Sequence, residues 1–152
     1  MRVSRFLLLI FISLAVPSAM QAQEAKTDRD NIQGVWEVAT AEQEGKDFGE
    51  FVKEVSPKWI FNGTKYTFKA GPNSEDGKFK LDTTGKLCAI DLIITEGKDK
   101  GKYQLGIYQL DGNNLKMCFA AVGTPDRPAA FATKAKTPAA YVLVTLKRQK
   151  KE

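Results

Sequence analysis

Apolar and polar residues alternate along most of the chain after residue 31. In the first alternating segment, Trp36, Val38 and Thr40 share one face, because successive side chains of a strand point to opposite faces. Later segments repeat this period with the pairs Trp59 and Phe61, Tyr66 and Phe68, and Phe79 and Leu81. The period predicts strands that turn one face to a common interior and the other to water.

Turn residues separate these segments. They occur at Asn62-Gly63, at Gly71-Pro72-Asn73-Ser74 with Ser74-Glu75-Asp76-Gly77, at Gly97 to Gly101, and at Asp111-Gly112-Asn113. The strands number about eight and their connections are mostly short. Closing such a sheet on itself removes both unpaired edges. The chain is therefore predicted to be all-β, an eight-stranded up-and-down antiparallel barrel with one short helix after the first strand.

The interior is predicted from the alternating segments before Ile90 and from the central stretch Ile90 to Phe119, and the final run Tyr141 to Arg148 places Val142, Val144 and Leu146 on one face. The expected inward set is Phe61, Tyr66, Phe68, Phe79, Leu81, Ile90, Leu92, Leu105, Ile107, Leu115, Met117 and Phe119. The segment Gly106-Ile107-Tyr108 is apolar on both faces, so its pattern alone does not decide which face turns inward.

Two segments break the strand period. From Asp47 to Ser56 the apolar residues fall at helical spacing and Pro57 follows, which predicts a short helix over one end of the barrel. We favour plain packing over a moving lid for this helix. The segment from Ala121 to Thr137 is long for a hairpin loop. Phe131 could pin this loop to the barrel, which leaves Arg127 available to an anion or a partner carboxylate.

The N-terminus has the pattern of a secretory signal peptide: Arg2 and Arg5, then the apolar run Phe6 to Val16, then Pro17. We predict a signal peptide at residues 1–22, a flexible leader at 23–31, the barrel at 32–149 and a basic tail at 150–152. The apolar run is too short for a membrane span. The protein is thus expected to be secreted or periplasmic, a monomer, and without a stable membrane span after cleavage.

Composition excludes several kinds of chemistry. The chain has no histidine, which removes the commonest general acid–base residue and metal ligand, and its 2 cysteines cannot form a zinc site unaided. We therefore expect a protein that is not an enzyme, with no catalytic residue, metal or cofactor. The net charge is +5, and its C-terminal lysines lack the interleaved aromatic residues of a nucleic-acid platform. No nucleic-acid partner is expected.

The two cysteines, Cys88 and Cys118, would reach a compartment that permits disulfides. Strand parity places Cys88 on the face of Ile90, whereas Cys118 lies opposite its neighbour Met117. This parity favours two small thiols over a bridge, and a bridge remains the alternative.

Gly34-Val35-Trp36 resembles the Gly-x-Trp signature that opens the first strand of lipocalins. In that superfamily a late arginine packs across the tryptophan, and Arg148 has the position and parity to do so here. The chain also resembles, over nearly its whole length after the signal, an uncharacterised lipocalin-like domain family found largely in planctomycetes. The residues that carry this resemblance, in chain order, are Gln33 to Trp36, Ile90 to Leu92, Glu96-Gly97, Gly101-Lys102, Gly106 to Tyr108, Leu110 to Gly112, Leu115 to Phe119, Arg127-Pro128 and Phe131.

The resemblance implies a small secreted or envelope barrel and no established site residues. Our leading hypothesis is a non-enzymatic barrel that holds a small apolar ligand inside. Its candidate ligand-binding residues are Phe61, Tyr66, Phe68, Phe79, Leu92, Ile107, Met117, Phe119 and Arg127, and its structural residues are Gly34, Trp36 and Arg148. The alternative is a protein-binding module, such as a secreted protease inhibitor or an envelope interaction protein, that uses the leader or the Arg127 loop.

Overall fold

The computed structural model describes residues 27–133 and 140–150. The helices within these ranges are α1 (Asp28–Asn31) and α2 (Gly49–Val55). The strands are β1 (Gly34–Gln43), β2 (Lys46–Asp47), β3 (Lys58–Asn62), β4 (Lys65–Ala70), β5 (Asn73–Asp82), β6 (Cys88–Glu96), β7 (Tyr103–Asp111), β8 (Asn114–Phe119) and β9 (Val142–Arg148). The signal peptide, residues 23–26 of the leader and the end of the basic tail lie outside the described residues.

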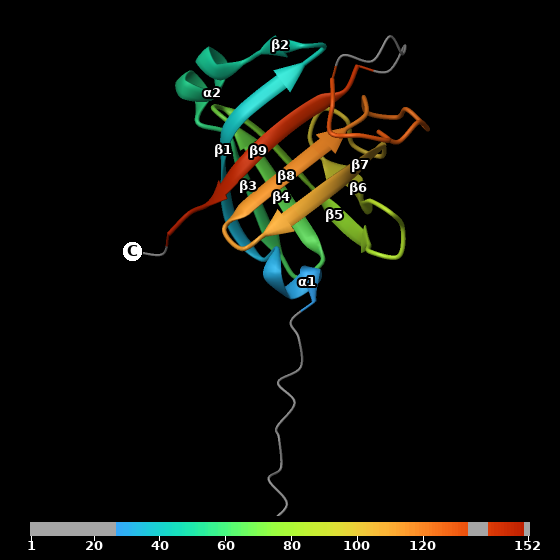
Figure 1. The fold of residues 1–152 in the computed structure, drawn as a ribbon. Helices are drawn as coiled ribbons and strands as arrows, with labels where there is room; N and C mark the ends of the chain where they lie inside the picture. Colours follow the sequence, from blue (N-terminus) through green and yellow to red (C-terminus); the bar gives the residue numbers. More distant parts are fainter. Residues whose placement is uncertain (1–26, 134–139, 151–152) are drawn as a thin grey trace, which may run out of the picture.

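The strands close into a barrel. Each strand is antiparallel to its neighbours in the order β1, β3, β4, β5, β6, β7, β8 and β9, and β9 pairs back with β1. The predicted eight-stranded up-and-down barrel, with a short helix after its first strand, is thus confirmed. Figure 1 shows α2 and β2 at one end of the barrel and α1 at the other. We call these the α2 end and the α1 end.

Alternation fills the interior. Leu115 of β8 lies opposite Leu146 of β9, and Met117 lies opposite Val144. These four side chains belong to one buried cluster, in which Met117 is 0% exposed. Burying one large apolar side chain contributes roughly 1.5–3 kcal/mol. The period-two pattern of the sequence therefore places these side chains where their burial stabilises the closed sheet.

One predicted turn is wrong. Gly71-Pro72 alone connects β4 to β5, and the run from Ser74 to Gly77 lies within β5. The β5–β6 pairing shifts register between Asp76 and Gly77, where Thr95 of β6 is the extra residue. A Cβ at Gly77 would lie 2.4 Å from both the Tyr66 ring and the Ile93 carbonyl oxygen. Gly77 therefore lets the Tyr66 ring and the Ile93 carbonyl approach its backbone inside a strand. The polar residues before Gly77 gave this part of the sequence the pattern of a turn.

Part of the expected leader is folded. Thr27 and Asp30 form a capping box that begins α1, and Ile32 follows with its side chain in the core. The Tyr108 hydroxyl donates a hydrogen bond of 2.8 Å to Asp28 Oδ2. The capping box and this bond hold residues 27–31 against the α1 end of the barrel.

The helix α2 confirms the expected helix and is shorter than Asp47 to Ser56. Asp47 belongs to β2, and its side chain accepts a hydrogen bond of 3.0 Å from the Gly49 backbone at the start of α2. Ser56 ends the helix in the left-handed region with a φ of 45°. Within the described residues, neither helix has the length and hydropathy that crossing a membrane requires.

Candidate functional site

An apolar cavity of about 230 Å³ lies inside the barrel at the α2 end. Its lining comes from strands on both sides of the barrel and from the helix above. The lining residues are Val38, Ala41, Phe51, Val52, Pro57, Trp59, Phe68, Glu75, Gln104, Phe119, Val142 and Val144. We call this space the α2 cavity. The rest of the interior holds the side chains of the core cluster.

Aromatic rings form one wall of the α2 cavity. The Trp59 ring stacks on Phe119 with a centroid distance of 5.7 Å and an interplanar angle of 12°. The Phe68 ring lies 5.0 Å from Trp59, since the two residues are paired across β3 and β4. Offset and tilted ring pairs of this kind are favourable beyond the area that they bury. The wall is therefore a rigid aromatic surface.

The helix α2 forms the roof. Val52 and Phe51 both line the cavity, but Val52 is buried whereas Phe51 is 47% exposed. Phe48, at the start of the helix, is also exposed. Because Phe51 contacts both the cavity and solvent, the cavity lies close to solvent at this residue.

Two polar side chains line the otherwise apolar cavity. Glu75 accepts a hydrogen bond of 2.8 Å from the Tyr66 hydroxyl. Gln104 donates a hydrogen bond of 2.8 Å through Nε2 to the Ala120 carbonyl. Burial raises the pKa of Glu75 above its usual value, against the lowering effect of the Tyr66 bond. Burial also raises the pKa of Tyr66, so its hydroxyl keeps its proton and acts as a donor.

Only part of the predicted ligand-binding set lines the α2 cavity. Phe68 and Phe119 do so. Five others belong to the core cluster but do not line this cavity, namely Phe61, Tyr66, Phe79, Leu92 and Met117. The sequence prediction missed Glu75, because it assigned this residue to a turn, and Gln104, because it considered only apolar side chains.

Ile107 does not face the interior, contrary to the expected inward set. It pairs with Ala89 and with Cys118, whose neighbours Met117 and Phe119 point into the core. Leu105 has the same parity and also lies on the outer face. Ile107 is nevertheless 2% exposed, since the segment after β8 covers this part of the outer face. The strand β7 is apolar on both faces because one face lies in the core and the other lies beneath the loop that follows β8.

Arg127 does not line the α2 cavity either. Its Nη1 atom donates hydrogen bonds to the carbonyls of Gly106, at 2.8 Å, and Ile90, at 3.3 Å. Its Nη2 atom lies 2.7 Å from Asp91 Oδ1 in an ion pair. The expected carboxylate partner thus comes from the same chain. These contacts anchor the loop of Arg127 on the outer face of the sheet.

The α1 end is closed by Arg148. Its guanidinium carbon lies 4.2 Å from the centroid of the Trp36 ring. Its nitrogens donate to the backbone carbonyls of Gln33 and Asn31, and Nε donates to Asn113 Oδ1 at 3.2 Å. Gly34 adopts a φ of 116°, and a Cβ there would lie 3.2 Å from Arg148 Nη1. Gly34, Trp36 and Arg148 thus pack together and close the α1 end of the barrel.

Cys88 and Cys118 are free thiols on opposite faces of the sheet. Cys88 packs against the core cluster, and Cys118 faces the loop that Arg127 anchors. Burial raises the pKa of the Cys118 thiol. A raised pKa leaves little thiolate at neutral pH, so this cysteine is a poor nucleophile.

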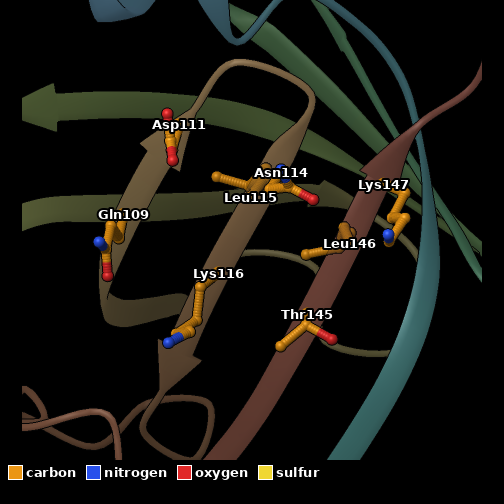
Figure 2. A pocket seen from close by; sticks show the side chains of 8 residues that line it. All are labelled: Gln109, Asp111, Asn114, Leu115, Lys116, Thr145, Leu146 and Lys147. Atoms are coloured by element: carbon orange, nitrogen blue, oxygen red, sulfur yellow. The ribbon is translucent and has the colours of Figure 1, made fainter.

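A second hollow, of about 320 Å³, lies on the outer surface over β7, β8 and β9. Figure 2 shows the side chains that line it: Gln109, Asp111, Asn114, Leu115, Lys116, Thr145, Leu146 and Lys147. Leu115 and Leu146 belong to the core, and the others are polar side chains with charges of both signs. This hollow has the character of ordinary sheet surface and lacks the convergent apolar wall of the α2 cavity.

Among the residues that the structure describes, no group of three or more metal-ligating side chains is close enough to hold a metal ion. Comparison of the chain with protein-family models, with curated proteins and with solved structures found no match. The resemblance to a lipocalin-like family therefore stays a prediction, while the barrel and its α2 cavity are observed features of the chain.

Proposed function

We propose that this protein is a non-enzymatic binding barrel that holds a small, mainly apolar ligand in the α2 cavity. The observation that supports this proposal is the apolar space beneath α2, next to the core cluster that occupies the interior. Binding sites for small molecules are concave, mostly apolar and equipped with a few polar groups. The α2 cavity has this character, with Glu75 and Gln104 as its polar groups.

The volume restricts the ligand. Drug-sized ligands occupy sites of about 300–1,000 Å³, whereas benzene enters an apolar cavity of about 150 Å³. The α2 cavity, at about 230 Å³, lies between these sizes. We therefore propose a ligand with a single ring or a short alkyl chain, and not a long-chain lipid.

We further propose that the protein acts outside the cytoplasm, as a secreted or periplasmic monomer, after removal of the N-terminal segment. The support is the sequence pattern of residues 1–22. Mass spectrometry of the protein recovered from its host should give the mass of a chain that starts near residue 23. Recovery of the full-length chain would contradict this part of the proposal.

Binding can be tested with bromobenzene, because a bromine atom in contact with an indole ring quenches its fluorescence. Trp59 lines the α2 cavity, whereas Trp36 does not and has Arg148 stacked on its ring. Titration of the wild-type protein should give saturable quenching. In Trp59→Phe most of this response should be lost, while Trp36→Phe should retain it. Absence of saturable quenching in the wild type would refute the proposal.

The alternative function, a protein-binding module, receives less support. It needs an exposed segment that can enter a partner, and its two candidates are the leader and the Arg127 loop. Residues 27–31 are held in α1, and the loop is held through Arg127 and Asp91. Co-purification with the full-length protein as bait would favour this alternative if the captured partner were lost on deletion of residues 23–31.

A further inference from the structure

The geometry of the α2 cavity points to a ligand of one chemical class: a small organic amine whose ammonium group pairs with Glu75 while its apolar body contacts the aromatic wall. This inference rests on the proposed binding function and adds the charge and the polar group of the ligand. It is argued from the position of Glu75, from the charges around it and from the hydrogen-bonding character of the other lining groups.

Glu75 faces the interior of the barrel. On β5 it lies directly opposite Phe68 of β4, whose side chain packs against the core cluster. Residues paired across an antiparallel sheet share a face, so the Glu75 side chain also points inward, beside the α2 cavity. The next inward position of β5 is Gly77, which lies opposite Tyr66 of β4. A carboxylate thus stands in a barrel interior that is otherwise mainly apolar.

Glu75 has no cationic partner in the described part of the chain. The ion pairs there are Lys58 with Glu37, Lys100 with Glu96, Lys102 with Asp99, and Arg127 with Asp91. The Tyr66 hydroxyl, a neutral donor, occupies one oxygen of Glu75. An ionised carboxylate can accept about four hydrogen bonds. A bound ammonium ion would supply both the missing positive charge and further donors.

The other groups that line the cavity suit the same ligand. Gln104 uses its amide nitrogen on the Ala120 carbonyl, so its carbonyl oxygen is left as an acceptor. Trp59, Phe68 and Phe119 present ring faces and edges, and indole is the ring that attracts a cation most strongly. Acceptors and aromatic rings favour a donor-rich cation. A ligand carboxylate would meet Glu75 as a like charge.

The test compares three ligands that share a phenyl-alkyl body: 2-phenylethylamine, the neutral 2-phenylethanol and the anionic 3-phenylpropanoate. Calorimetric titration at neutral pH should show the amine binding about tenfold or more tightly than the alcohol, because its hydrogen bonds to Glu75 are charge-assisted. The anion should bind more weakly than the alcohol. Glu75→Gln should bind amine and alcohol alike, since the amide keeps an acceptor for Tyr66 and loses the charge.

Glu50→Gln is the matched control, because Glu50 is an exposed carboxylate on α2 that does not line the cavity. This variant should keep the wild-type preference for the amine. If the amine and the alcohol bind the wild type equally, while bromobenzene still quenches Trp59, the amine inference is wrong and the proposed binding function stands. If neither these ligands nor bromobenzene bind, both are wrong. Circular dichroism of each variant shows that it is folded.

Discussion

The two ends of the barrel are closed by different means. At the α1 end, Arg148 stacks on Trp36 and donates to the carbonyls of Gln33 and Asn31, and α1 covers the opening. At the α2 end, a helix lies over a cavity of about 230 Å³ with Phe51 partly in solvent. The α1 end is closed by directed polar contacts, and the hollow beside Arg148 there, of about 910 Å³, lies among mainly polar and charged side chains. The α2 end is covered by apolar contacts. We therefore expect substitutions at the α1 end to act mainly on stability and substitutions at the α2 end to act mainly on the proposed binding.

The largest expected effect is at the α1 end. Arg148→Ala removes the stacking on Trp36 and leaves two backbone carbonyls without their donor, so we expect the free energy of unfolding to fall by about 2–4 kcal/mol. Urea denaturation would measure the loss. Lys147→Ala, at the exposed neighbouring position of β9, is the control and should change stability little. Equal effects of the two substitutions would remove the contrast between the ends.

The next effect concerns binding at the α2 end. Ala41→Leu adds three carbons to a residue that lines the cavity, so bromobenzene affinity should fall about tenfold or more, whereas the free energy of unfolding should change by less than about 1.5 kcal/mol. Ala39→Leu makes the same change at an exposed position of the same strand and should leave affinity unaltered. If Ala41→Leu binds bromobenzene normally, the ligand lies elsewhere.

A smaller effect is expected at the roof. Phe51→Ala removes a ring that touches the cavity and is half in solvent, so we expect affinity for bromobenzene to fall by about threefold to tenfold and stability to fall by less than about 1.5 kcal/mol. Phe48→Ala is the matched control, because Phe48 is exposed and does not line the cavity. A large loss of stability in Phe51→Ala would mean that the roof is a core element.

The smallest effect is a pH dependence of stability. Burial holds the pKa of Glu75 above its unfolded value, and nearby Asp99 also raises it. The folded state then binds the proton more tightly, so stability from this group is full below the unfolded pKa, about 4.3, and is lost as pH rises through the raised folded pKa. The stability of Glu75→Gln minus that of the wild type should therefore be larger at pH 7 than at pH 4. Thermal unfolding of both proteins at the two pH values measures this difference. A difference of opposite sign would place Glu75 in a stabilising contact.

Alternation along the chain predicted much of the barrel, because a closed sheet keeps one face inside. Trp59, Phe61, Phe68 and Phe79 are all inward, as their period indicates. The same parity set Cys88 and Cys118 on opposite faces. The sequence also predicted the turns at Gly63 and Gly112, where the glycine adopts a positive φ.

The rest could not be predicted from the alternation, for three physical reasons. The loop anchored by Arg127 buries Ile107 from outside, so the period-two contrast disappears on β7. The polar run from Ser74 to Gly77 resembles a turn but pairs with β4 as part of β5, so the sequence pattern did not show that Glu75 points inward. The cavity itself depends on how much space aromatic rings leave between them, and a pattern of apolar positions does not carry that information.

The seam between β1 and β9 has a consequence for how the chain folds. The Thr40 and Thr145 hydroxyls lie 2.5 Å apart although they are separated by 105 residues of chain. The remaining barrel pairs join strands that are close in sequence, so their loops close at a smaller entropic cost. We expect the local hairpins to form first and the seam last. Until the seam forms, β1 and β9 are exposed edges that other strands can join, so slow closure would appear as concentration-dependent aggregation during refolding.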